Sequence, residues 1–474
     1  MNKVTKTTLW LADNLDYLRT QSGSNSKDGI GEGMVDLIYI DPPFNSKRNY
    51  NIVFDAETDA SEQAFSDVWS RVAYLDLMPE INSIAPELHK FLVLLKETGV
   101  SESMLSYLSH MAIRCYYMRK MLKDTGSFYY HCDPTASHYI KIVLDYIFGI
   151  KNFRNEIVWC YSRWSNVQRQ FQSQHDCLLF YSKSKYNTFN EIRTPLAKAR
   201  KRNLVELVDG KKVCKRDEAG NIIYKQQIDA PLTSWWCMDR LGNTAKERLG
   251  YPTQKPEALL ERIIKASSNE GDLVADFFLG GGTTAAVCRK LNRNFLGMDL
   301  NYRAIQITKE RLERLGAVIK KDLIIHGIPS NSKDLRRMVD ENIIGHEKNS
   351  RFELEDITVK YYLKGVVGNS VKVGDGSIDG RFGFTHEGVQ KRGIVQVTSG
   401  SNKNHLKAFC SEIGKGNADM GVYVTFADNI TEGFVREVKG YGKIGGVDKI
   451  QLLSFEDLID RRIQFQLPPD GSLF

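Results

Sequence analysis

Short apolar runs that end in acidic or glycine-rich segments recur along the first two thirds of the chain. They cover residues 35–40, 126–131, 273–278 and 295–298. Each run is continuous rather than alternating, which is typical of a parallel strand that is buried on both faces and carries a functional loop at its carboxyl end.

Segments with helical periodicity lie between these runs. They cover residues 105–123, 136–148, 256–268 and 283–291. An alternation of strands and helices predicts an α/β domain with a doubly wound, mostly parallel sheet.

The pattern changes towards the C-terminus. Residues 329–350 are polar and charged and are expected to form a linker. A second, smaller α/β pattern begins at residue 351, with strands expected near 393–397 and 420–426. A chain of 474 residues is too long for one simple core, so several domains are expected.

Positive charge is concentrated in the middle of the chain. The net charge is +7, but residues 151–255 hold 20 Lys/Arg and 10 Asp/Glu, so this window carries +10 and the rest of the chain sums to −3. Such a cluster is typical of a nucleic-acid groove. A solvated, lysine-rich insertion has the same composition, and charge alone leaves both readings open. A hairpin is expected around residues 217–221.

The cysteines and the hydropathy argue against several protein classes. The eight cysteines include no C-x-x-C pair, so no zinc site and no resident metal are expected. The first ten residues are polar and lack the core of a signal peptide. No apolar run approaches the roughly 20 residues that a membrane helix needs. We therefore expect a soluble, cytoplasmic protein without membrane contact.

A glycine-rich segment, residues 276–284, follows one predicted strand and opens a helix. Its glycines allow the backbone to approach a ligand, and the helix start offers free N–H groups to an anion. The next strand ends in Asp299, which can accept hydrogen bonds from both hydroxyls of a ribose. A lone glycine loop is often only a tight turn, but this order of elements predicts an adenosine-cofactor site. The spacing matches neither a dinucleotide fingerprint nor a P-loop.

The tetrapeptide Asp41-Pro42-Pro43-Phe44 follows another predicted strand. Two prolines stiffen the backbone and remove two donors, which leaves the carbonyls of Asp41 and Pro42 as acceptors. Together with the Asp41 carboxylate they suit an exocyclic amine on a planar ring, and Phe44 can stack on that ring. Two acceptors localise the amine lone pair for in-line attack on a methyl sulfonium, which is catalysis by positioning and electrostatics. A rigid turn is the alternative.

These motifs together resemble those of amino-methylating DNA methyltransferases. The tetrapeptide looks like their catalytic motif, and residues 278–284 look like their S-adenosylmethionine loop. Residues 252–256 resemble the segment beside the cofactor methionine, and Asp13 resembles the acidic site near the cofactor adenine. The catalytic motif precedes the cofactor loop, an order typical of the beta group, in which the target recognition region lies between the two.

The resemblance implies a Rossmann-like methyltransferase domain that uses S-adenosyl-L-methionine. Its catalytic half would be residues 1–184, its target recognition region 185–250 and its cofactor-binding half 251–328, followed by the linker and a domain at 351–474. The implied catalytic residues are Asp41, Pro42, Pro43 and Phe44. The implied cofactor-binding residues are Asp13, Asp41, Thr253, Lys255, Asp276, Phe278, Gly280, Gly282, Thr283, Thr284 and Asp299.

The resemblance also implies a reaction and a substrate. Asp at position 41 favours methylation of adenine N6 in a specific sequence of double-stranded DNA, with the adenine flipped out of the helix. Cytosine-N4 enzymes more often carry Ser there, and cytosine-N4 or RNA methylation and a DNA reader with vestigial catalysis are the alternatives. Phosphate contacts are expected from the basic residues Arg193, Lys198, Arg200, Lys201, Arg202, Lys211 and Lys212.

The C-terminal domain resembles the Mrr-like branch of the restriction-endonuclease fold. Asp379 and Gln396 match two positions of its metal site, but Thr398 stands where that site has a lysine. Because threonine supplies no positive charge, a vestigial site with a role in DNA contact or dimer formation is favoured over cleavage. A bifunctional restriction–modification enzyme is the alternative, and a homodimer and a cognate restriction endonuclease stay open as partners.

Overall fold

The structure of the protein is a computed structural model. It describes residues 5–21, 30–43, 49–53, 61–66, 74–162, 169–208, 210–242, 245, 247–249, 251, 253–329, 331–340, 354–355, 357–363, 365–368 and 378–473. Phe44 therefore lies outside the described residues, and so does most of the second half of the expected linker.

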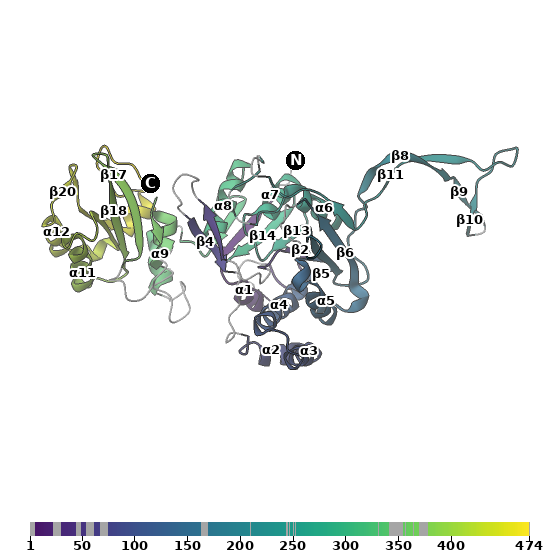
Figure 1. Cartoon of the computed structure of the whole chain (residues 1–474), viewed down its shortest axis with the longest axis horizontal. Helices are drawn as coiled ribbons and strands as arrows, with labels where there is room; N and C mark the ends of the chain where they lie inside the picture. The colour runs from purple at the N-terminus through teal and green to yellow at the C-terminus, as the bar shows by residue number, and fades with distance from the viewer. Residues whose placement is uncertain are drawn as a thin grey trace.

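A nine-stranded sheet forms the centre of the larger unit (Figure 1). Strand β7 is antiparallel to both of its neighbours, and all other neighbouring pairs are parallel. In spatial order the strands are β12 (Trp235–Cys237), β6 (Phe153–Cys160), β7 (His175–Ser182), β5 (Leu122–Cys132), β2 (Val35–Ile40), β13 (Leu273–Asp276), β14 (Asn294–Asp299), β1 (Thr7–Leu11) and β15 (Leu323–His326).

Helices cover both faces of this sheet. One face packs against α1 (Asn14–Gln21), α2 (Met78–Ile84), α3 (Pro86–Glu97), α4 (Glu102–Met121) and α5 (Pro134–Phe148), and the other against α6 (Glu257–Ser267), α7 (Thr283–Lys290) and α8 (Tyr302–Arg314). Successive side chains of β2 alternate between the two cores, with Ile38 and Ile40 in one and Leu37 and Tyr39 in the other. The predicted doubly wound α/β architecture is therefore confirmed. No helix in the described ranges is both long and apolar enough to cross a membrane.

The order of the strands reverses between β2 and β13. From β2 the chain continues to β5 on one side, whereas β13 is followed by β14 on the other side. Ligands of open α/β sheets bind at such a switch point, outside the carboxyl ends of the strands. The segments after β2, β13 and β14 all meet there.

The segment expected to recognise the target forms a long two-stranded arm. Strands β8 (Arg193–Asn203) and β11 (Tyr224–Pro231) pair in antiparallel orientation, and the arm extends well away from the nine-stranded sheet (Figure 1). A second hairpin of β9 (Val205–Val208) and β10 (Lys211–Cys214) lies at its far end. The hairpin expected around residues 217–221 is confirmed by an antiparallel bridge between Arg216 and Ile222. Strands β3 (Asn49–Val53) and β4 (Ser61–Ser66) form a separate antiparallel pair.

The C-terminal unit is a smaller α/β structure around a five-stranded mixed sheet. Its order is β16 (Val367–Gly368), β17 (Gly380–His386), β18 (Val389–Val397), β19 (Met420–Thr425) and β22 (Ile450–Ser454). Strands β18, β19 and β22 are parallel, and α11 (Lys403–Gly414) and α12 (Glu432–Lys439) connect them. Strands β18 and β19 confirm the two strands that the sequence predicted here.

The first part of the expected linker is a helix instead. Residues Ser332–Asp340 form α9, and Leu335 and Met338 are buried in the core of the C-terminal sheet. Ser332 donates a hydrogen bond from its backbone N–H to Asp460 at 2.9 Å. The segment was predicted to be a linker because its polar residues outnumber its apolar ones, but two apolar residues one turn apart are enough to dock a short helix.

Candidate functional site

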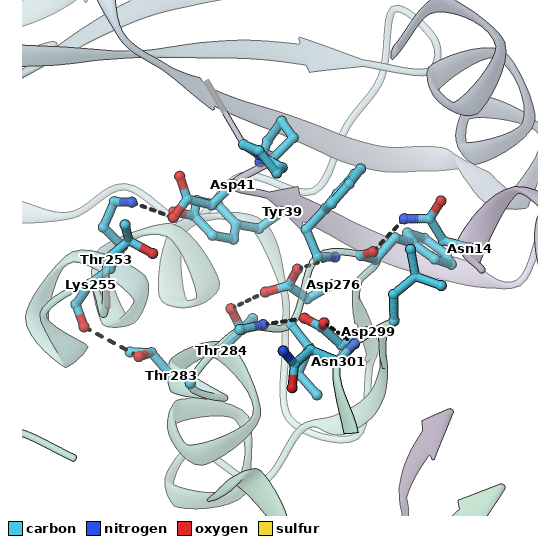
Figure 2. A pocket seen from close by; sticks show the side chains of 18 of the residues that line it. Asn14, Tyr39, Asp41, Thr253, Lys255, Asp276, Thr283, Thr284, Asp299 and Asn301 are labelled. Atoms are coloured by element: carbon cyan, nitrogen blue, oxygen red, sulfur yellow. Dashed lines mark hydrogen bonds and ion pairs between the residues drawn. The ribbon is translucent and has the colours of Figure 1, made fainter. Parts of the chain in front are cut away.

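A cavity of about 540 Å³ lies at the switch point of the nine-stranded sheet. Its walls come from the ends of β1, β2, β13 and β14 and from the segment before α6. Figure 2 shows side chains from these separate segments converging on the cavity. It is lined by all of the predicted cofactor residues except Gly282, namely Asp13, Asp41, Thr253, Lys255, Asp276, Phe278, Gly280, Thr283, Thr284 and Asp299.

Asp41 follows β2 and faces the cavity together with Pro42 and Pro43. One carboxylate oxygen, Oδ2, accepts a hydrogen bond from the ammonium of Lys255. The other, Oδ1, is buried and has no hydrogen-bond partner among the described residues. A buried, unpaired carboxylate oxygen is costly, so this atom is suited to receive a donor from a ligand.

The segment before α6 places Lys255 against Asp41. Thr253 adopts a left-handed backbone conformation with φ of 62°, which turns the chain back towards the sheet. The backbone carbonyl of Lys255 accepts a hydrogen bond from the hydroxyl of Thr283 at 3.3 Å. Because both ends of Lys255 are held, its ammonium stays beside Asp41 and fixes the position of that carboxylate.

Asp276 ends β13 and lies deep under the cavity. Its two oxygens accept hydrogen bonds from the Thr284 hydroxyl at 2.6 Å and the Phe278 N–H at 3.0 Å. Burial, with a smaller contribution from the neighbouring Asp41, outweighs these bonds and raises the pKa of Asp276 to about 7. Thr284, expected to bind the cofactor, therefore holds Asp276 in place.

Asp299 ends β14 and is fixed by the glycine loop. Its carboxylate accepts the N–H groups of Gly280 and Asn301, both at 2.8 Å. Burial raises the pKa of Asp299 to about 6. Each carboxylate oxygen keeps a second lone pair, so the group can still accept the hydroxyls of a ribose.

Two glycines of the loop have different reasons to be glycine. Gly280 has φ of 51° and lies against the ring of Tyr251, so a side chain would crowd this wall of the cavity. Gly282 caps α7 with φ of 68°, and a Cβ atom there would lie 2.2 Å from the Thr308 hydroxyl. Gly282 is not among the residues that line the cavity, and the lack of a side chain there lets α7 pack against α8; its contact with the cofactor stays a prediction.

The other end of the cavity is organised by an arginine that the sequence analysis missed. Arg114, on α4, donates to Asp13 at 3.1 Å and to Asn14 at 2.6 Å. Asn14 in turn donates to the backbone carbonyl of Phe277 at 2.7 Å. Asp13, which follows the carboxyl end of β1, is thus held beside the cavity. A group near the cofactor base is expected to lie there. Arg114 shows no signal in sequence because its partner lies 101 residues away.

The predicted DNA-binding residues lie on the arm. Lys198, Arg200, Lys201 and Arg202 are exposed on β8, and Lys211 and Lys212 are exposed on β10. Arg202 lies directly opposite Lys225 of β11. Arg193 differs, because its guanidinium is paired with Asp229 at 2.8 Å and with Glu191 at 2.5 Å.

The predicted nuclease-like residues come together in the C-terminal sheet. Asp379 precedes β17 and accepts the backbone N–H of Val397 at 2.7 Å, which places it beside β18. Gln396, on β18, is fully buried, and its amide has no hydrogen-bond partner among the described residues. Within those residues there is no group of three or more His, Cys, Asp or Glu that could hold a metal ion.

Comparisons with known proteins bear on the larger unit. The type II methyltransferase M.HpaI of Haemophilus parainfluenzae is 28% identical over 346 residues, which are 71% of this chain and 88% of that protein. The DNA adenine methyltransferase YhdJ of Escherichia coli strain K12 is 28% identical over 282 residues, 59% of this chain and 76% of the relative. The crystal structure of a Thermus thermophilus protein described as a putative DNA modification methylase, complexed with S-adenosyl-L-methionine, superposes with a TM-score of 0.37 at 14% identity and covers 68% of this chain and 98% of that one.

The family match covers the strands of the sheet from β2 to β14 and most of the residues that line the cavity. A family model described as DNA methylase, for enzymes that methylate amino groups at N6 or N4, matches residues 35–310. This range is more than half of the chain and contains Asp41, the glycine loop and Asp299. The chain therefore belongs to the N6/N4 DNA methylase family.

Proposed function

We propose that this protein methylates the N6 amino group of adenine in double-stranded DNA, with S-adenosyl-L-methionine as the methyl donor. The observation that carries the proposal is the unpartnered Oδ1 atom of Asp41, which is buried and faces the same cavity as the glycine loop. Membership of the DNA methylase family and the name of the adenine methyltransferase relative support the reaction class. The alternative, cytosine-N4 methylation, is less favoured.

The residues present fit the cofactor. Asp299 would accept the two ribose hydroxyls, and Asp13 lies where the adenine amine would reach it. The acidic groups Asp41 and Asp276 face the part of the cavity that would hold a positively charged sulfonium. When bound, the cofactor supplies a methyl group activated by that sulfonium. The residues of this chain contribute by positioning the cofactor and the substrate amine.

The substrate amine would be held by two acceptors. Its hydrogens would be donated to Asp41 Oδ1 and to the backbone carbonyl of Pro42, because no N–H of Pro42 or Pro43 competes there. Lys255 pairs with the other carboxylate oxygen of Asp41 and leaves Oδ1 for the amine. Phe44 is proposed to stack on the flipped base, although it lies outside the described residues.

The test is transfer of a tritiated methyl group to duplex DNA by the full-length protein. We expect incorporation by the wild type and loss of about 10²-fold or more with Asp41→Ala, because one preorganised acceptor is removed. Digestion of the product to nucleosides should yield N6-methyl-2′-deoxyadenosine. Equal incorporation by wild type and variant would contradict the mechanism, and N4-methyl-2′-deoxycytidine would contradict the substrate.

The arm is proposed to hold the DNA backbone. Like charges directly opposite each other in a sheet are destabilising, and Arg202 and Lys225 form such a pair. The negative charges of a polyanion against this face would neutralise the repulsion between the two cations, and both cations would then contribute to binding. Lys198, Arg200, Lys201, Lys211 and Lys212 add to it. Arg193 is tied to two carboxylates and is proposed to brace the base of the arm rather than to bind phosphate.

We propose that the C-terminal unit is an Mrr-like, nuclease-related domain that contacts DNA or forms a dimer without cutting DNA. Asp379 is hydrogen-bonded to the backbone of Val397, the residue after Gln396, but no lysine follows at position 398. No cleavage of unmethylated DNA is expected with Mg²⁺ or Mn²⁺. Cleavage that Asp379→Ala abolishes would support a bifunctional restriction–modification enzyme instead. We also propose that the protein forms a homodimer, has a cognate restriction endonuclease as a partner and is located in the cytoplasm.

A further inference from the structure

A buried histidine lies directly behind the catalytic aspartate. His131, on β5, has no exposed side-chain surface, and its Nδ1 lies 3.8 Å from Asp41 Oδ1, the unpartnered oxygen. The same Nδ1 is 2.8 Å from the hydroxyl of Tyr39. The residue is not among those that line the cavity, and it lies at the end of the strand predicted over residues 126–131.

A second carboxylate holds the far side of this ring. The Nε2 atom of His131 lies 3.2 Å from Asp176 Oδ2, on the neighbouring strand β7. Tyr161 donates its hydroxyl to the other oxygen of Asp176 at 3.0 Å. Burial alone would raise the pKa of Asp176, but His131, Lys255 and Tyr161 together lower it to about 2. Asp176 is therefore an anion at neutral pH.

These contacts define the tautomer and the electrostatic setting of the histidine. Asp176 can only accept, so Nε2 carries the proton and the lone pair of Nδ1 accepts a hydrogen bond from the Tyr39 hydroxyl, with Asp41 Oδ1 3.8 Å away. The ring lies edge-on to Trp159, with centroids 5.6 Å apart, which limits its rotation. The titratable groups around this arrangement are Tyr39, Asp41, Asp133, Tyr161, Asp176, Lys255 and Asp276.

The proposed reaction has to dispose of a proton. The amine lone pair forms the new nitrogen–carbon bond, the electron pair of the carbon–sulfur bond returns to sulfur, and one N–H proton must leave the nitrogen. Asp41 Oδ1 is the nearest acceptor, but a carboxylate is a weak base. An imidazole backed by a carboxylate is a better place for the proton, because the imidazolium would lie between two anions.

We propose that His131, held by Asp176, is a positioning residue that takes up, through Asp41, the proton released by the substrate amine; this inference rests on the proposed function. The proton passes from Asp41 Oδ1 to His131 Nδ1, and the Tyr39 hydroxyl gives up its hydrogen bond to that nitrogen as the new N–H bond forms. The two atoms must approach by about 1 Å to reach hydrogen-bond distance, and catalytic hydrogen bonds commonly tighten in this way when substrate binds. The proton leaves to solvent after the methylated base has left the site.

The test measures single-turnover methyl transfer to duplex DNA by the full-length protein as a function of pH. For His131→Asn we expect a rate about 10²-fold lower near neutral pH, with unchanged affinity for S-adenosylmethionine and DNA. The wild-type rate should fall at acid pH, because an imidazole that already carries both ring protons has no lone pair to take up another, and this acid limb should be missing in the variant. The matched control is His138→Asn, which makes the same chemical change on the exposed side of α5 and should behave like the wild type.

Two further variants separate the proposed role from a structural one. Asp176→Asn keeps the imidazole but removes its anion, so the acid limb should move to lower pH. Tyr161→Phe removes a donor that competes for Asp176, so the limb should move to higher pH, and this partly exposed position also serves if His131→Asn does not fold.

The outcomes are distinct. A wild-type rate in His131→Asn, or slower variants whose acid limbs do not move, would overturn the inference. If the wild type itself transferred no methyl group to DNA, the proposed function would fail instead.

Discussion

Three of the four carboxylates that line the cavity lie at the ends of β2, β13 and β14, and each has different hydrogen-bond partners. Asp41 is paired with Lys255 on one oxygen and open on the other. Asp299 is fixed by two backbone N–H groups, and Asp276 is buried beneath both. Both Asp276 and Asp299 are buried and bonded only to uncharged donors, and burial raises the pKa of each; at Asp276 the neighbouring anions Asp41 and Asp299 raise the pKa further, to about 7.

Cofactor affinity should depend on pH through Asp276. Its pKa of about 7 in the free protein means that it is largely protonated below neutral pH. A nearby sulfonium favours the ionised form, so affinity for S-adenosylmethionine should rise about ten-fold between about pH 6 and about pH 8, with proton release on binding. Calorimetry in buffers of different ionisation enthalpy measures both. Asp276→Asn should flatten the dependence, and a pH-independent wild type would contradict the argument.

At the scale of elements, the start of α7 shows how a loop glycine can serve packing. Gly282 combines a left-handed φ of 68° with close contact to Thr308 of α8, whereas Gly271 has φ of 85° and open space around it. A Cβ atom strains the backbone at either position, but only at position 282 does it also meet another helix.

The matched pair of alanine variants should therefore differ in stability. Gly271→Ala is expected to cost about 1 kcal/mol from backbone strain alone, and Gly282→Ala about 2 kcal/mol more from the clash with Thr308. Thermal unfolding of the full-length variants compares them directly. Adding Thr308→Ala to Gly282→Ala should recover part of the loss. If the two single variants had the same melting temperature, the contact between α7 and α8 would not be the reason for the glycine at position 282.

The positive charge of the arm lowers the stability of its two-stranded sheet but is expected to favour DNA binding. Replacing Arg202 and Lys225 together by Ser should lower affinity for duplex DNA and reduce the salt dependence of log K by about 2, one unit for each phosphate that is no longer neutralised. The melting temperature should stay the same or rise, since a cross-strand repulsion disappears. Lys90→Ser with Lys96→Ser on α3 removes the same charge elsewhere. An equal loss of affinity in that control would point to net charge rather than to the arm.

At the scale of the whole molecule, a feature could be predicted when the residues that form it lie close together in the chain, and could not when they lie far apart. Asp41 and the glycine loop are contiguous motifs, and the strands before them are continuous apolar runs, so both fold class and cavity could be predicted. Arg114 and His131 act through partners 101 and 45 residues away, so no local pattern marks them. The docking of α9 could not be predicted for a related reason. The C-terminal sheet whose core it joins comes later in the chain, after the segment that follows α9.

The boundary between the two units can be tested with fragments of the C-terminal region. Leu335 and Met338 of α9 are buried in the core of the C-terminal sheet, and the Ser332 side chain also hydrogen-bonds to Asp460 at 2.5 Å. A fragment of residues 331–474 keeps this helix, whereas a fragment of residues 351–474 exposes the surface that α9 covers. Two buried apolar side chains are worth about 3 to 6 kcal/mol, a large part of the stability of a small domain. Circular dichroism during heating should show cooperative unfolding for the longer fragment and a much lower, broader transition for the shorter one. Identical melting of the two would place α9 outside the folding unit.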